Sequence, residues 1–116
     1  MSTARLDAAF AALADPTRRG VVSLLRLGPR RAGELAQELD MSAPAMSRHL
    51  RVLRESGLIE DQRGDDARVR VFRLRPEPFS ALRGWLDEVE AVWTDQLTAF
   101  AAHAERGRSP APRKKR

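Results

Sequence analysis

The first forty residues show apolar positions three or four apart, the spacing of one face of an α-helix. The pattern predicts a first helix that ends near Asp15, and a second that Asp15 caps with Pro16 in its first turn. Gly28 and Pro29 end this second helix. A third short helix is expected over residues 32–39. The inward residues of the three helices are Leu6, Ala9, Phe10, Leu13, Val21, Val22, Leu24, Leu25, Leu27, Leu35, Ala36 and Leu39.

A fourth helix is predicted over residues 43–55, directly after a short turn of sequence DMS. Ser42 is placed to cap its first turn, and Pro44 lies where the missing amide hydrogen of proline costs nothing. Its core-facing residues recur at i, i+4 and i+7; they are Met46, Leu50 and Leu53. The outward side then carries only small or cationic residues, namely Ala43, Pro44, Ser47, Arg48 and Arg51.

Gly57 closes the fourth helix, and two short strands are expected over residues 58–63 and 68–74. The loop GDDA between them tolerates tight turns, so the strands should form a hairpin. After the segment RPEP, one long helix is predicted to end near residue 104. The expected fold class is mostly α with a small β-hairpin: four helices, two strands and a fifth helix.

Composition narrows the classes of protein that this fold can serve. A chain of 116 residues fits one domain with a modest core. It has no cysteine, which excludes disulfides, thiolate metal sites and a redox role, and fits a reducing cytoplasm. Charged residues interrupt every apolar run, and the N-terminus lacks the pattern of a signal peptide, so neither membrane insertion nor export is expected.

The net charge of +5 is unevenly distributed. Residues 105–116 carry six basic residues against one acidic, whereas residues 1–104 carry 15 of each sign. Within that neutral part, residues 16–75 hold 13 basic and 8 acidic residues, and residues 77–104 hold 1 and 5. Such segregation fits a domain with one face toward phosphate, although it is also common in proteins that bind no DNA.

The third and fourth helices with their tight turn match the geometry needed to enter the major groove of duplex DNA. Small outward residues on the fourth helix permit entry, and arginines there suit guanine edges and phosphates alike. The hairpin adds Arg63, Arg68 and Arg70 for the neighbouring backbone or minor groove, although Asp65 and Asp66 at its tip weaken that attraction. The alternative is a module for protein contacts, because similar elements occur there too.

Three stretches are specific enough to carry a family resemblance: LADPTRRGVVSLL, ELAQELDMSAPAMSRHLRVLRESGLI and a charged hairpin ending in VFRL. Over residues 8–75 the chain resembles the ArsR family of winged-helix repressors, with SRHLRVLRESGL as the most diagnostic stretch. The resemblance implies a winged helix-turn-helix protein. It also implies a homodimeric repressor that binds double-stranded DNA near its own promoter and leaves when a signal arrives.

The resemblance places the reading helix at residues 42–55. His49 stays open between a DNA contact and a hydrogen-bonded packing residue, because it lies beside the core-facing positions. The predicted DNA-binding set is Ser42, Ala43, Pro44, Ser47, Arg48, His49, Arg51, Arg63, Arg68 and Arg70.

The family's common thiolate metal site falls on Arg31 and Gly33, neither of which binds a soft metal. A second family site on the last helix needs several converging ligands, but this helix has only His103, which we interpret as an exposed residue. No metal or other cofactor is therefore expected, and the effector, a small molecule or a protein, is not identified by the sequence. No nucleophile, phosphate loop or catalytic trio points to an enzyme.

The last helix carries more apolar surface than a small domain covers alone, which favours a dimer interface over packing on its own core. In the family the first and last helices form this interface. Its predicted residues are Leu6, Phe10, Leu13, Leu82, Leu86, Val89, Trp93, Leu97 and Phe100, with Trp85 and Val92 widening the stripe. Both tryptophans are interpreted as packing residues rather than cavity walls. Residues 1–104 are thus expected to form the DNA-binding and dimerisation domain, and residues 105–116 a disordered basic tail that adds DNA affinity or solubility.

Overall fold

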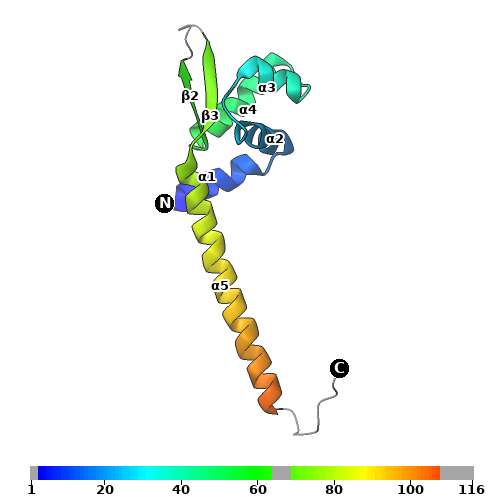
Figure 1. Cartoon of the computed structure of the whole chain (residues 1–116), viewed down its shortest axis with the longest axis vertical. Coiled ribbons are helices and arrows are strands. Elements are labelled where there is room, and N and C mark those ends of the chain that lie inside the picture. Colours follow the sequence, from blue (N-terminus) through cyan, green and yellow to red (C-terminus); the bar gives the residue numbers. More distant parts are fainter. Residues whose placement is uncertain (1–2, 64–68, 108–116) are drawn as a thin grey trace. The chain divides into compact units, whose positions relative to one another are not determined.

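The structure is a computed structural model that describes residues 3–63 and 69–107 (Figure 1). The described residues form α1 (Thr3–Leu13), α2 (Pro16–Leu25), β1 (Arg30–Arg31), α3 (Ala32–Glu38), α4 (Ala43–Glu55), β2 (Ile59–Arg63), β3 (Arg70–Leu74) and α5 (Pro76–Gly107). This order confirms the predicted fold class. None of the described helices is long and apolar enough to cross a membrane.

The chain divides into two compact units, residues 1–82 and residues 83–116. The first unit contains α1 to α4, the sheet and the start of α5. The described part of the second unit is the rest of α5, which continues through Gly107. The helix is therefore three residues longer than the sequence pattern predicted, and residues 105–107 belong to it rather than to a disordered tail. The remainder of the predicted tail lies outside the described residues.

Capping residues fix where the helices of the first unit begin and end. The carboxylate of Asp15 accepts a hydrogen bond from the backbone N–H of Arg18 at 2.9 Å, and Ser42 Oγ accepts one from the backbone N–H of Ala45 at 3.2 Å. Both bonds satisfy amide groups that the first turn of a helix leaves without partners. Gly57 follows α4 with φ of +83°, a conformation that glycine adopts without strain. The predicted starts of α2 and α4 are confirmed.

The sheet has three antiparallel strands in the order β1-β3-β2. The hairpin pairs Ile59 with Leu74 at one end and Arg63 with Arg70 at the other. On its other side β3 pairs with β1, a strand of two residues that the sequence analysis missed. A strand this short has no alternating pattern to detect, and it exists only because β3 lies beside it. Of the predicted second strand, Arg68 lies outside the described residues.

The core of the first unit lies between the helices and the inner face of the sheet (Figure 1). Its largest fully buried side chains are Val21, Leu35, Met46, Leu53, Leu58 and Ile59. Leu82 belongs to the same core, with only 7% of its surface exposed. This corrects the prediction that Leu82 lies at a dimer interface, because its side chain is already buried within one chain.

Candidate nucleic-acid interface

The face of α4 opposite the core consists of exposed side chains. Ser42, Ala43, Pro44, Ser47, Arg48 and Arg51 are all exposed, whereas Met46, Leu50 and Leu53 are buried, as the helical spacing predicted. Across the described parts of the chain, no hydrogen bond or ion pair engages the side chain of Arg48 or Arg51. Two cationic groups on this face are thus available to an anionic partner.

A tight turn sets α4 against α3. Asp40 adopts the left-handed conformation with φ of +54°, which aspartate tolerates better than most residues. The backbone N–H of Met41 then donates to the carbonyl oxygen of Ala36 at 2.8 Å, which ties the turn to the end of α3. Together α3, this turn and α4 form a helix-turn-helix.

His49 lies in a polar cluster at the inner edge of α4. Its Nδ1 atom is 3.4 Å from Nη1 of Arg18 and 3.8 Å from Oδ2 of Asp15, and its side chain is 21% exposed. These contacts match the packing interpretation of His49 rather than the exposed position of Arg48 and Arg51. The pKa of the Asp15 carboxyl is lowered, chiefly by the backbone N–H of Arg18 and further by the charges of Arg18 and His49.

Arg18 joins three helices through one guanidinium group. Besides its contact with His49 on α4, it donates from Nε to the carbonyl oxygen of Ala12 at 2.7 Å and from Nη2 to that of Ala11 at 3.3 Å. These carbonyls belong to the last turn of α1, where the regular helical hydrogen bonds end. That of Ala11 also accepts a hydrogen bond from the backbone N–H of Ala14 at 3.2 Å. Arg18, on α2, therefore links the end of α1 to the helix that carries the exposed arginines.

Replacing Arg18 with methionine is expected to destabilise the fold by about 1 to 3 kcal/mol, because charge-assisted bonds to half-buried acceptors are lost while the aliphatic stem is kept. The measurement is urea denaturation followed by circular dichroism. Arg19→Met is the matched control, since exposed Arg19 donates one such bond, to the carbonyl oxygen of Leu13 at 2.8 Å. Equal losses of stability in the two variants would contradict the special role of Arg18.

The predicted hairpin arginines differ in their surroundings. Arg70 on β3 donates to Oδ2 of Asp61 on β2, at 2.9 Å from Nε and 2.7 Å from Nη2, and lies over the Phe72 ring at 5.5 Å. Oδ1 of Asp61 is 3.4 Å from Nη1 of Arg54, in the last turn of α4. Arg63 faces Arg70 across the hairpin. Asp61 thus connects the hairpin to α4, a role that the sequence analysis missed.

These bonds act on the ionisation of Asp61. The hydrogen bond from Arg70 lowers the pKa of the Asp61 carboxyl, desolvation opposes it, and Arg54 lowers it further. A carboxyl whose pKa is lower in the folded chain stabilises the fold above the ordinary unfolded value of about 3.9. That contribution is lost as the pH falls through the folded-state pKa.

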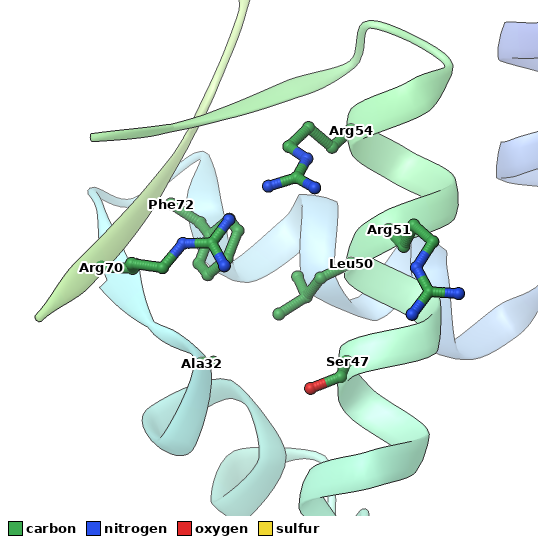
Figure 2. A pocket seen from close by; sticks show the side chains of 7 residues that line it. All are labelled: Ala32, Ser47, Leu50, Arg51, Arg54, Arg70 and Phe72. Carbon is green, nitrogen blue, oxygen red and sulfur yellow. The ribbon is translucent and has the colours of Figure 1, made fainter. Parts of the chain in front are cut away.

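A hollow of about 330 Å³ lies between α4, β3 and the start of α3 (Figure 2). In Figure 2, Arg54 and Arg70 reach into it from α4 and β3, the Ser47 hydroxyl points toward it, and the Arg51 guanidinium points outward from its edge. Buried Leu50 and Phe72 form its floor. The complete lining is Ala32, Ser47, Leu50, Arg51, Arg54, Arg70 and Phe72. The predicted DNA-binding set did not include Arg54.

A helix-turn-helix followed by a hairpin defines the winged helix-turn-helix class, and α4 with its exposed arginines occupies the reading position of that class. The family model described as "Bacterial regulatory protein, arsR family" matches residues 15–61, from the cap of α2 into β2. Together with the relative and the solved structure described in the next paragraph, this match shows that the chain belongs to the ArsR family. It is therefore a DNA-binding transcription regulator and not an enzyme, as its sequence predicted.

Relatives and solved structures agree with this assignment. The chain is similar to the HTH-type transcriptional regulator Rv2034 of Mycobacterium tuberculosis, with 45% identity over 102 residues, covering 87% of this chain and 91% of the relative. It is 51% identical over 55 residues to the arsenical resistance operon repressor of Escherichia coli strain K12, covering 47% of each chain. The crystal structure of an ArsR family transcriptional regulator superposes with a TM-score of 0.73 at 38% identity, covering 81% of this chain and 95% of that one.

Proposed function

We propose that this protein is a sequence-specific repressor of its own operon that binds double-stranded DNA as a homodimer and acts in the cytoplasm. The observation that carries the proposal is the exposed face of α4, where small residues face outward together with Arg48 and Arg51, whose side chains have no ionic partner among the described residues. A helix with such a face fits the major groove, and arginine recognises guanine edges in a bidentate manner. The repressor relative from Escherichia coli supports the direction of regulation.

The contacts proposed for α4 and the hairpin differ in kind. Ser47, Arg48 and Arg51 are assigned to the major groove, with Ser42, Ala43 and Pro44 near the backbone at the helix start. Arg63 and Arg70 of the hairpin, together with Arg68, are assigned to the neighbouring backbone or minor groove. His49 is assigned to positioning α4, because Arg18 and Asp15 surround its Nδ1 atom.

The dimer is proposed from the apolar surface of α5. Five large side chains of the predicted stripe are exposed, with exposed fractions of 59% for Trp93 and 70% for Phe100; the others are Leu86, Val89 and Leu97. Monomeric soluble proteins rarely leave a contiguous stripe of this kind in water. On α1, Phe10 is exposed, whereas Leu6 and Leu13 are partly buried against the core and have less surface to offer.

The experiment that tests the function is recovery of bound fragments from the organism's own genomic DNA, followed by footprinting. The proposal predicts protection of an inverted repeat upstream of the protein's own gene, with half-sites about one helical turn apart. Binding that is uniform along all fragments and depends only on salt would contradict it. Capture of a protein partner whose binding needs Ser47, Arg48 and Arg51, without any DNA site, would favour the alternative of a protein-interaction module.

The signal that releases this repressor is proposed not to be a metal ion or arsenite. The family resemblance aligns the common thiolate site with Arg31 and Gly33, and the sequence has no cysteine. Within residues 3–63 and 69–107, no three histidine, aspartate or glutamate side chains are grouped to hold a metal ion. A small molecule or a partner protein therefore remains as the effector.

Addition of zinc, cadmium or arsenite is accordingly expected to leave the affinity for the protected fragment unchanged. The sequence has no cysteine to supply thiolates, and its two histidines are too few for a cluster of imidazole ligands. Fluorescence anisotropy with stoichiometric additions measures this. A chelator added after the metal serves as the reversal control. Stoichiometric binding of any of these ions, accompanied by release of DNA, would contradict the proposal.

A further inference from the structure

We propose that the hollow between α4 and β3 is a seat for a backbone phosphate group of the bound DNA, and that Asp61 limits how strongly the seat holds it. This inference rests on the proposed function. It adds a phosphate contact between the reading helix and the hairpin, and a carboxylate that weakens this contact. The seat is the 330 Å³ hollow of Figure 2, lined on opposite sides by Arg54 and Arg70.

The place of the hollow in the fold favours a phosphate as its occupant. One sugar-phosphate strand separates a major groove from the minor groove beside it, so a helix in the first and a hairpin at the second lie on either side of that strand. The hollow lies between those two elements, α4 and β3. A phosphodiester group there would meet the guanidinium groups of Arg54 and Arg70, both of which donate hydrogen bonds to phosphate oxygens.

Arg70 is held in place for such a contact before DNA arrives. Its guanidinium lies 5.5 Å from the centre of the Phe72 ring, and Phe72 is fixed in the core. Stacking on a buried ring restricts the rotamers of a long side chain, so less conformational entropy is lost when it binds an anion. The seat is therefore partly preorganised by the sheet.

The negative charge of Asp61 weakens binding of a phosphate group in the seat. Its two carboxylate oxygens contact Arg54 at 3.4 Å and Arg70 at 2.7 and 2.9 Å, so one negative charge is shared by the two cations of the seat. The pair of arginines with Asp61 carries one net positive charge instead of two. Phosphate contacts give affinity for every DNA sequence, so a carboxylate here lowers non-specific binding without touching base recognition.

The other face of the same hairpin provides a matched control. Glu60 precedes Asp61 on β2, and successive side chains of a strand point to opposite faces. Its carboxylate is 2.6 Å from Arg73 and 3.9 Å from Arg75, so it also contacts two arginines, neither of which lines the hollow. Glu60→Gln and Asp61→Asn thus remove the same charge from adjacent residues.

The experiment measures binding of the full chain to a mixed-sequence 30-base-pair duplex across a salt series. Asp61→Asn is expected to bind on the order of tenfold more tightly than wild type per bound subunit at about 0.1 M salt, because one additional counterion is released at each seat. The plot of log affinity against log salt should steepen by about 1 per bound subunit. Glu60→Gln should stay near wild type. Equal behaviour of the two variants would overturn the inference.

A second pair of variants tests the seat if Asp61→Asn does not fold. Arg70→Gln should flatten the salt dependence by about 1 per bound subunit, while Arg73→Gln on the opposite face should not. The double variant Asp61→Asn with Arg70→Gln should return to wild-type affinity, because the net charge of the seat is restored. An Arg70→Gln slope equal to that of Arg73→Gln would overturn the inference.

Two further outcomes distinguish the DNA-phosphate seat from a protein that binds no DNA and from a seat for a free anion. Wild-type protein that binds no duplex at all would overturn the proposed function and the inference with it. Submillimolar binding of inorganic phosphate that requires Arg70, without any change in DNA affinity for Asp61→Asn, would show that the seat takes a free anion and would overturn its assignment to DNA. Wild-type binding to DNA, with Asp61→Asn stronger than Glu60→Gln, supports the inference.

Discussion

Replacing Trp93 and Leu97 together with glutamate is expected to give a monomer that no longer binds the operator tightly. Both side chains are about half exposed or more in the single chain, and they lie one turn apart on α5. Each large apolar side chain that a dimer buries contributes roughly 1.5 to 3 kcal/mol relative to its exposed state. Two such residues from each chain therefore supply a large part of what offsets the entropy lost on association.

Loss of the dimer should also remove most of the DNA affinity, although no residue of α4 is changed. In a twofold dimer two reading helices bind half-sites roughly 34 Å apart, and the second binds at a high effective concentration once the first is placed. A monomer retains one reading helix and loses that gain. Affinity for the full operator should then fall to about that for an isolated half-site.

Sedimentation velocity at micromolar concentration, combined with DNA binding, measures both effects. Thr94→Glu with Thr98→Glu is the matched control, because it adds the same charges at the same spacing on α5 but outside the apolar stripe. That control should remain a dimer with wild-type affinity. A wild-type monomer at micromolar concentration, or full operator affinity in the monomeric variant, would contradict the proposal that dimerisation through α5 supplies most of the operator affinity.

The parts of the fold that depend on local sequence were predictable. Asp15 and Ser42 cap their helices through bonds to residues three positions on, and the spacing of Met46, Leu50 and Leu53 sets the buried side of α4. These signals lie within one helical turn, so no tertiary information is needed to find them. The bounds of α4 were predicted correctly for that reason.

The parts that depend on contacts between elements were not predictable. Strand β1 forms only because β3 lies beside it, and Leu82 is buried because the start of α5 packs into the core of the first unit. The bonds from Asp61 to Arg54 and Arg70 join residues seven and nine positions away on two different elements. Helical periodicity gives no sign of such pairs, which explains why Arg54 and the bonds between Arg70 and Asp61 were missed.

Replacing Arg48 and Arg51 with alanine is expected to weaken operator binding strongly while leaving the fold intact. Both side chains are exposed on α4, and the described residues offer neither of them an ionic partner, so their removal costs the folded chain little. An arginine bidentate to guanine contributes about 1 to 3 kcal/mol to binding. Two such residues in each reading helix together correspond to a loss of at least one hundredfold in affinity, since about 1.4 kcal/mol is tenfold.

The central claim is tested most directly by the operator affinity of the Arg48→Ala, Arg51→Ala variant. This affinity is measured by fluorescence anisotropy with the protected fragment at moderate salt. Arg26→Ala with Arg83→Ala removes the same charge from two exposed arginines outside α4 and serves as the control. We predict at least a hundredfold loss for the α4 variant, little change for the control and unchanged thermal unfolding for both. Wild-type affinity in the Arg48→Ala, Arg51→Ala variant would contradict the assignment of α4 as the DNA-reading helix.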